Sequence, residues 1–205
     1  MIEKIATQQD GKPSGVRESI LAAAAELFAI RGYTATSVRE VVEAAGCRKP
    51  TLYYYFENKE ELYRQVVETS CTRITDTVNS AMAPAGTVRE RMRRGLCAYL
   101  GLVREQPTTL KLLMAAERQP EAGQPRFDFD AFRLGTVEMI RLMLQRGVQT
   151  GELRQNLNVE EAALCLFGMV DYRLVLFLHG TPIPDDYPER LLDLFFNGVG
   201  SCLTR

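Results

Sequence analysis

The sequence predicts an all-α fold of about nine helices, arranged as three short helices, one connecting helix and five longer ones. Apolar residues recur at helical spacing along almost the whole chain, and alternating strand patterns are nearly absent. Polar breaks that contain Gly or Pro separate the periodic segments. Several segments also start with Ser, Thr, Asn or Asp followed three residues later by Glu, the capping-box signature of a helix N-terminus.

The first three helices are short and closely spaced. We expect a polar, mobile N-terminal arm over residues 1–14, followed by a first helix over about 17–29. Ser37, with a Glu three residues on, opens a second helix of about two turns that ends at Gly46. A third helix over about 49–54 follows, with a Pro in its first turn, where a missing N–H costs nothing.

The connecting helix is expected over 58–80, and a Pro-Ala-Gly break follows it. Later helical stretches are expected over 87–105, 108–118, 128–149, 158–179 and 187–203. The expected N-caps of these helices are Asn58, Thr87, Asn158 and Asp186. We therefore divide the chain into a first domain over 15–60 and a second over 61–205.

Composition excludes several classes of protein. The 205 residues carry a net charge of -1, so any nucleic-acid binding must come from a local patch. Five scattered cysteines and one histidine indicate neither a disulfide scaffold nor a zinc site, and we expect no metal and no cofactor. No secretion signal and no membrane span are evident, so a cytoplasmic protein is expected.

The second and third helices, joined by a short turn that contains Gly46, form the pattern of a helix-turn-helix. In that motif the second helix presents its N-terminal residues to the major groove of DNA. Arg48 and Lys49 lie at this leading end, and between Gly46 and Lys59 there are three cations against one acid. The pattern therefore predicts that the third helix reads DNA.

A family resemblance strengthens this prediction. The first helix ends in Phe and is followed by Arg-Gly-Tyr; Thr-Ser precedes the second helix, and Ala-Ala-Gly forms the turn. Thr-Leu-Tyr-Tyr-Tyr-Phe then runs into Asn-Lys-Glu-Glu-Leu. The stretch from Gly15 to Val67 closely resembles the N-terminal domain of the TetR family of bacterial transcriptional regulators, without a gap. A second, weaker similarity is the segment Arg146–Arg154, which is similar to the end of the seventh helix in many family members.

The resemblance implies a role for each matching position in DNA binding. Contacts to phosphates or base edges are implied for Thr36, Ser37, Arg48, Lys49, Pro50, Thr51, Tyr53, Tyr54 and Lys59. The family commonly has a small hydroxyl residue where Arg48 stands, and an arginine cannot cap the helix in that way. Arg48 either reads a guanine or contacts a phosphate, and the sequence does not decide between the two.

The resemblance also implies a homodimer built from the last two helices and a pocket for a small apolar ligand. Ala162–Leu178 is apolar nearly all round, so the helix needs partners on every side. Candidate interface residues are Leu164, Phe167, Leu174, Val175, Leu178, Leu191, Phe195 and Val199. Candidate pocket residues are Met92, Leu96, Tyr99, Leu100, Arg104, Leu113, Met114, Glu117, Phe132, Met139, Met143 and Tyr172. The same apolar stripes would also serve as plain core, or as the interior of a monomer.

These features predict a homodimeric repressor that binds double-stranded DNA at a palindromic operator and is released by a small apolar effector. An architectural DNA binder without a ligand, or an activator, remains an alternative. A helical enzyme acting on a small apolar substrate is the least favoured interpretation. No Ser-His-Asp set, phosphate loop or carboxylate cluster at metal spacing is present in the sequence.

Overall fold

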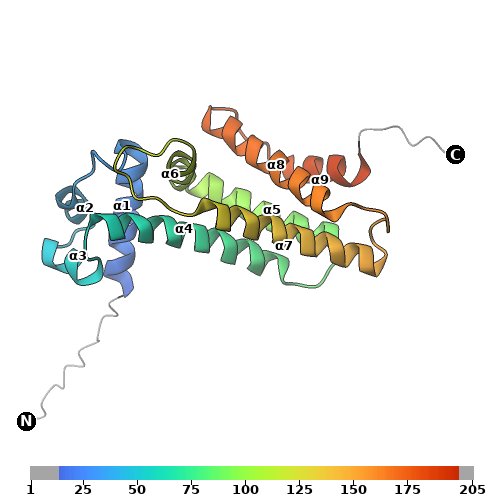
Figure 1. The fold of residues 1–205 in the computed structure, drawn as a ribbon, viewed down its shortest axis with the longest axis horizontal. Coiled ribbons are helices and arrows are strands. Elements are labelled where there is room, and N and C mark those ends of the chain that lie inside the picture. The colour runs from blue at the N-terminus through green and yellow to red at the C-terminus, as the bar shows by residue number, and fades with distance from the viewer. Residues whose placement is uncertain (1–13, 199–205) are drawn as a thin grey trace, which may run out of the picture.

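A computed structural model describes residues 14–198, and this part of the chain forms α-helices and no strands (Figure 1). The predicted all-α class is confirmed. In chain order the helices are α1 Ser14–Arg31, α2 Val38–Ala44, α3 Lys49–Tyr55, α4 Lys59–Met82, α5 Val88–Glu105, α6 Pro107–Arg118, α7 Phe129–Thr150, α8 Val159–Leu178 and α9 Tyr187–Asn197.

The expected helix boundaries agree with these bounds to within a few residues, except at the end of the chain. The last helix was expected to reach residue 203, but α9 ends at Asn197. Gly198 follows with a φ of 70°, in the left-handed region that stops a helix. Residues 199–205, which include the predicted interface residue Val199, lie outside the described residues, as does most of the predicted arm.

The predicted caps differ in outcome. Ser37 and Thr87 form complete capping boxes with the Glu three residues on. Asn58 and Asn158 accept a hydrogen bond from the N–H three residues on, as expected. Asp186 occupies the predicted N-cap position of α9, but the expected capping hydrogen bond is absent, and its carboxylate lies 3.7 Å from the Arg190 guanidinium instead.

The helices form two parts joined by α4. In Figure 1 the helices α1–α3 lie at one end, and α4 runs from them along the bundle beside α5. The first helix was expected to be short, but α1 has 18 residues. α8 packs on α7, and α9 packs on α5. The N-terminal part is not an isolated unit, because its core continues into α6 and the start of α7 through Leu112, Leu113, Ala116 and Phe129.

The remaining core lies inside the bundle in two clusters. One cluster surrounds Leu144 and includes Met82 and Val88, where α4 ends and α5 begins. The other surrounds Leu100 and includes Ile183 of the loop between α8 and α9. Arg104 ties α5 to that loop by donating to the carbonyls of Ile183 and Pro184, at 3.3 and 3.1 Å. Within residues 14–198, no helix has the length and apolarity needed to cross a membrane.

Candidate functional site

The helix-turn-helix is held by backbone geometry and by one buried side chain. Gly46 sits in the turn with a φ of 64°, and the Cys47 N–H donates to the Val42 carbonyl at 3.0 Å. Leu52, on the inner face of α3, is fully buried against α1 and α4 residues of the first core. The orientation of α3 is therefore fixed by the protein itself, before any DNA is bound.

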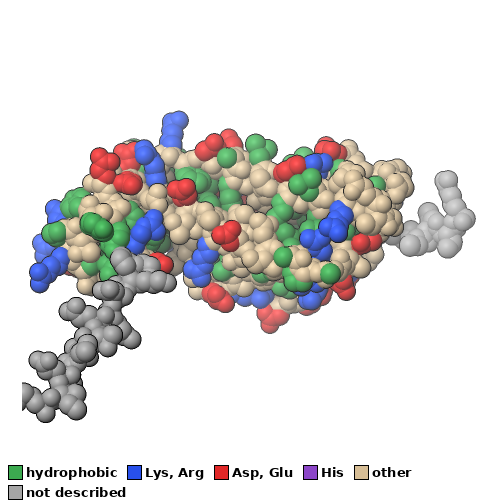
Figure 2. All heavy atoms as spheres, turned by 90° about the horizontal axis from the view of Figure 1, so that it is seen from below, with side chains coloured by type: hydrophobic (Ala, Val, Ile, Leu, Met, Phe, Trp, Pro, Cys, Tyr) green, Lys and Arg blue, Asp and Glu red, His purple; other side chains and the backbone are tan. Residues whose placement is uncertain are grey.

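The N-terminal end of α3 faces solvent. Arg48 is the N-cap residue, its side chain makes no capping hydrogen bond, and both it and Lys49 are exposed. The Lys49 ammonium lies 5.7 Å from the centroid of the Tyr53 ring, which holds the cation at the helix surface. Figure 2 shows Lys and Arg side chains gathered at the end of the molecule that carries α3.

Two tyrosines extend the same surface. Tyr53 and Tyr54 are 45% and 81% exposed, which is unusual for large aromatic residues unless a partner covers them. The Tyr54 ring packs edge-on against Tyr55, at 5.0 Å between centroids, and Tyr55 is half-buried. The exposed hydroxyls are therefore presented on rings that the core holds in place. Pro50 is also exposed, and Thr51 is half-buried.

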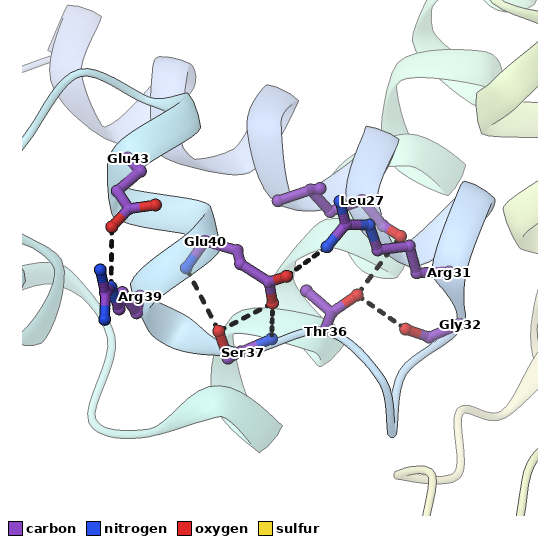
Figure 3. A network of polar contacts seen from close by, with 8 residues as sticks. All are labelled: Leu27, Arg31, Gly32, Thr36, Ser37, Arg39, Glu40 and Glu43. Carbon is purple, nitrogen blue, oxygen red and sulfur yellow. Dashed lines mark hydrogen bonds and ion pairs between the residues drawn. The ribbon is translucent and has the colours of Figure 1, made fainter.

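A polar network fixes the start of α2 (Figure 3). Glu40 accepts from the Ser37 N–H at 2.8 Å and from the Ser37 hydroxyl at 2.7 Å, and it pairs with Arg31 of α1. Ser37 remains exposed. Hydrogen bonding to Ser37 lowers the pKa of the Glu40 carboxyl, so the network keeps its charge at neutral pH.

Thr36 does not occupy the position that the resemblance implied. Its side chain is 1% exposed, and its hydroxyl donates to the Gly32 carbonyl at 2.8 Å (Figure 3). A side chain turned into the protein cannot reach a phosphate, so the expectation of a side-chain contact from Thr36 is wrong. Its role is to close the loop between α1 and α2.

Lys59 and Glu121 hold that same loop from outside. Glu121, in the loop between α6 and α7, accepts from the N–H groups of Tyr33 and Thr34 at 3.0 and 2.9 Å, and from the Thr34 hydroxyl. Lys59 lies 4.3 Å from the centroid of the Tyr33 ring and 3.4 Å from the Thr34 carbonyl oxygen. Burial lowers the pKa of Lys59, opposed by the charges of Glu121 and Glu40.

We call the contact of Glu121 with Tyr33 and Thr34 the loop latch. Gly32 makes room for it, because a Cβ at this position would overlap the Glu121 carboxylate. Gly32 also has a φ of 85°, which side chains rarely tolerate. The latch links the α6–α7 loop directly to the residues that precede α2, across a sequence distance that no local pattern reveals.

The second feature of the molecule is a cavity of about 770 Å³ inside the bundle, which we call the main cavity. Residues of α4, α5, α6, α7, α8 and α9 line it, and most of its surface is apolar. The size is within the range of sites that take a small molecule or cofactor. It borders both α4, which enters the N-terminal part, and α6, which precedes the latch.

Most of the predicted pocket residues line the main cavity. Those that do are Met92, Leu96, Tyr99, Leu113, Met114, Glu117, Phe132, Met139 and Met143. Three predictions are wrong: Leu100 is fully buried in the core, Arg104 is bound to the α8–α9 loop, and Tyr172 is 64% exposed on the outside of α8.

Sequence reasoning missed the α4 side of the cavity. The missed wall residues on α4 are Cys71, Ile74, Thr75, Val78, Asn79 and Met82. Their spacing of three and four residues was a detectable signal, since α4 carries a second face beyond the one that packs on α1. Leu174 was assigned to the dimer interface, but it is buried and lines this cavity.

Several of the polar groups that line the cavity come from α5, α6, α7 and α8. Glu117 pairs with Arg133, and Asp171 accepts from Arg118 at 2.6 Å. Burial, with the charges of Asp171 and Glu117 nearby, raises the pKa of Tyr99. Burial also raises the pKa of the Cys71 thiol to about 12, so it stays protonated. The cavity therefore offers apolar walls and a neutral phenol, while its carboxylates are already paired.

An apolar strip lies on the outer surface of α8 and α9. We call it the outer face, made of Leu164, Cys165, Met169, Tyr172 and Leu194, all exposed. Of the predicted interface residues, only Leu164 belongs to it. Leu174 and Leu191 are buried within the chain, and Phe167, Val175, Leu178 and Phe195 are half-buried. The predicted interface position is therefore wrong for Leu174 and Leu191, and for the half-buried residues it stays a prediction.

Among residues 14–198, no group of three or more His, Cys, Asp or Glu side chains is placed to hold a metal ion. The exposed groups at the α3 end are donors and cations, which suit phosphate oxygens and base edges. The fold thus joins an exposed basic surface at one end to an apolar cavity at the other.

Comparisons with known proteins agree on one family. Residues 20–66 match the family model described as bacterial regulatory proteins of the tetR family, and residues 82–195 match a tetracyclin repressor-like C-terminal domain. The uncharacterized HTH-type transcriptional regulator YdeS of Bacillus subtilis is 28% identical over 195 residues, covering 92% of this chain and 93% of its own length.

Two solved structures share the fold. Bacillus subtilis FadR in complex with stearoyl-CoA has a TM-score of 0.74 at 21% identity, covering 89% of this chain and 99% of that one. AibR in complex with isovaleryl coenzyme A and operator DNA has a TM-score of 0.67 at 22% identity, covering 88% and 98%. The two family models together match most of this chain, and both describe parts of tetR-type regulators. The chain belongs to the TetR family of bacterial transcriptional regulators.

Proposed function

We propose that this chain is a homodimeric repressor whose release from a palindromic operator is triggered by an acyl-CoA thioester. The main cavity carries the proposal, because its volume and apolar walls suit an acyl chain. Support for the thioester comes from the two similar proteins solved with stearoyl-CoA and isovaleryl coenzyme A. A ligand-independent architectural protein would instead be expected to fill its second domain with side chains.

On the DNA side, we assign base reading to Lys49 and Arg48, which lead α3 into the major groove with exposed side chains. Pro50 lies beside them and faces the base edges. Backbone phosphates are held by the hydroxyls at the ends of α2 and α3, those of Ser37, Thr51, Tyr53 and Tyr54. Lys59 acts mainly through the loop before α2, because its ammonium already faces Tyr33 and Thr34.

On the dimer side, we assign the interface to the outer face. It is the place on α8 and α9 where large apolar side chains remain exposed in the single chain, and burying them against a second copy removes them from water. A twofold dimer presents two copies of α3, which must lie roughly 34–36 Å apart to enter successive major grooves. A ligand that favours another spacing lowers the affinity for the operator.

The test of the function begins with the operator. Genomic fragments bound by the pure protein are selected and sequenced, and a palindrome with half-sites one helical turn apart is expected. Butyryl-, octanoyl- and palmitoyl-CoA are then titrated into the complex while its anisotropy is followed. Dissociation by at least one thioester supports the proposal; an operator complex that every thioester leaves unchanged contradicts the effector class.

The dimer is tested separately by sedimentation. Leu164→Asp places a charge in the outer face and is expected to give a monomer, whereas Leu134→Asp, at an even more exposed position on α7, is expected to leave the dimer intact. A monomeric wild-type protein, or a dimer that survives Leu164→Asp, would contradict the assigned interface.

A further inference from the structure

A second hollow lies at the junction of the two parts of the molecule. We call it the junction cleft; its volume is about 350 Å³, and α1, α4, α5 and α6 line it. Its floor is apolar and is formed by Leu21, Ala25, Val66, Val103 and Leu110. Its rim is polar, where Arg73 donates to Gln106 at 3.2 Å.

The junction cleft and the main cavity share a wall. Ile74, Tyr99 and Leu110 line both hollows, so the side chains of these three residues separate them. Ile74 and Leu110 are aliphatic, and no group among residues 14–198 forms a hydrogen bond with the Tyr99 hydroxyl, so none of the three has a polar contact to break when it moves.

Tyr99 is half-buried and lines the main cavity, where no neighbouring protein group holds its hydroxyl. It lies beside the paired carboxylates of Glu117 and Asp171, and burial raises its pKa, so it remains a neutral phenol. A ring held only by packing turns at small cost, whereas a ring held by a buried hydrogen bond does not. This position therefore has the properties of a gate between the two hollows.

We propose that the junction cleft receives the distal end of a straight acyl chain whose nearer part occupies the main cavity, with Tyr99 as the gate. The inference rests on the proposed effector class and adds the feature that selects chain length. A short chain fills the main cavity alone. A long chain passes the wall and places its methyl end against Leu21 and Ala25 of α1.

The chemistry of the cleft selects an apolar chain end over a polar head. Its floor offers five apolar side chains and no free charge, and its polar residues lie at the rim. A thioester head or phosphate placed on the floor would lose its hydration without gaining a partner. A polymethylene chain meets no such cost, and each further methylene that leaves water improves binding by about fourfold.

The position of the cleft gives the chain end a direct effect on DNA binding. α1 packs on α2 and α3 in the first core, so a group pressed against α1 acts on the helix-turn-helix without passing along α4. We therefore expect long-chain thioesters to displace the operator more effectively, at equal occupancy, than short-chain thioesters.

The experiment is calorimetric titration of the full-length protein with butyryl-, octanoyl-, dodecanoyl- and palmitoyl-CoA. Ala25→Leu fills the floor of the cleft. It is expected to lower the affinity for palmitoyl-CoA by about tenfold or more, while the affinity for butyryl-CoA stays unchanged. Ala23→Leu, half-buried on the same helix and lining neither hollow, is the matched control and should change neither affinity. Thr69→Leu on the exposed rim repeats the test if Ala25→Leu does not fold.

Each outcome decides the inference. Selective loss of long-chain binding supports it. Equal loss for short and long chains, or no loss for any, overturns it while leaving the effector class standing. If no thioester binds, the proposed effector class fails, and a series of straight-chain alcohols tests the cleft alone. In the wild type, affinity for the alcohols should rise with chain length, and in Ala25→Leu this rise should stop at a shorter chain; that result would still support the cleft. An affinity that does not rise with chain length, or a rise that Ala25→Leu leaves unchanged, would overturn it.

Discussion

The two ends of the molecule are built on opposite packing principles. The N-terminal part surrounds α3 with fully buried side chains such as Ile20, Leu52 and Phe56, and leaves its functional groups on the outside. The bundle does the reverse, because its helices α4–α9 surround an empty volume of about 770 Å³. A solid core holds one reading geometry, whereas a hollow one accommodates ligands of different shape.

The largest effect expected from this contrast is on stability. Leu52→Ala leaves a cavity in the solid core and is expected to reduce the free energy of unfolding by about 2–5 kcal/mol. Met139→Ala only enlarges a space that already exists, and the Met139 side chain has fewer packing partners. The free energy of unfolding should therefore fall clearly less for this variant than for Leu52→Ala. Urea denaturation of both variants measures the difference. Equal losses would remove the contrast between the two cores.

The next effect concerns the reading surface. Lys49→Ala removes an exposed cation without disturbing packing, so operator affinity should fall by about 1–3 kcal/mol while stability and dimerisation stay unchanged. Lys111→Ala, an exposed cation on α6, is the control and should bind the operator like the wild type. Anisotropy titrations at several salt concentrations should also show a shallower salt dependence for Lys49→Ala alone. Identical titration curves for both variants would place DNA contacts elsewhere.

A smaller effect is expected at the loop latch, where the solid and hollow parts meet. Glu121→Gln keeps the shape of the side chain but weakens hydrogen bonds to a charged acceptor, so we expect a loss of about 1 kcal/mol. The acceptor bonds from Thr34 lower the pKa of Glu121 below its ordinary value of 4.5. The stabilisation of the folded state by the Glu121 carboxylate is therefore fully present above pH 4.5, and it is lost as the pH falls through the lowered pKa.

Thermal unfolding of the wild type and Glu121→Gln across this pH range tests the latch. The two unfolding temperatures should differ at neutral pH and converge in acid. A difference that persists below the lowered pKa of Glu121 would show that its carboxylate does not stabilise the fold by accepting these bonds.

The smallest effect is expected for Tyr54→Phe, which removes one exposed hydroxyl and keeps the ring packed on Tyr55. The lost donor is an exposed, uncharged hydroxyl for which water competes, so losing its hydrogen bond to a phosphate should cost about 0.5–1 kcal/mol, roughly a two- to fivefold fall in operator affinity. A stability that stays at the wild-type value would confirm that Tyr54 acts only at the surface.

The sequence was sufficient where local chemistry decides the structure. The capping boxes at Ser37 and Thr87, the Gly46 turn and the missing cap at Arg48 were all predictable, because each depends on residues within one helical turn. Asp186 shows the limit, since its ion pair with Arg190 competes with the capping bond. The cavity was half predictable, through stripes of Met and aromatic residues on α5–α7.

What depends on contacts between distant segments could not be predicted. α8 is apolar on nearly every side and has no polar face, so the pattern of its residues does not show which side forms the outer face and which side lines the cavity. This explains why Leu174 was placed outside when it lies inside. Glu121 and Thr34 meet across the domain boundary, and an acidic residue in a loop gives no sign of such a partner.

The loop latch places two requirements on Gly32, and these limit which residues related regulators can carry at this position. Position 32 must adopt a positive φ and must also leave room for the Glu121 carboxylate. Asn satisfies the first demand but not the second. Relatives that have lost the acidic residue in the α6–α7 loop are therefore free to carry Asn in place of this glycine, whereas relatives that keep it are not. Positions 32 and 121 should therefore covary across the family, so that an alignment of related sequences would reveal the contact between them.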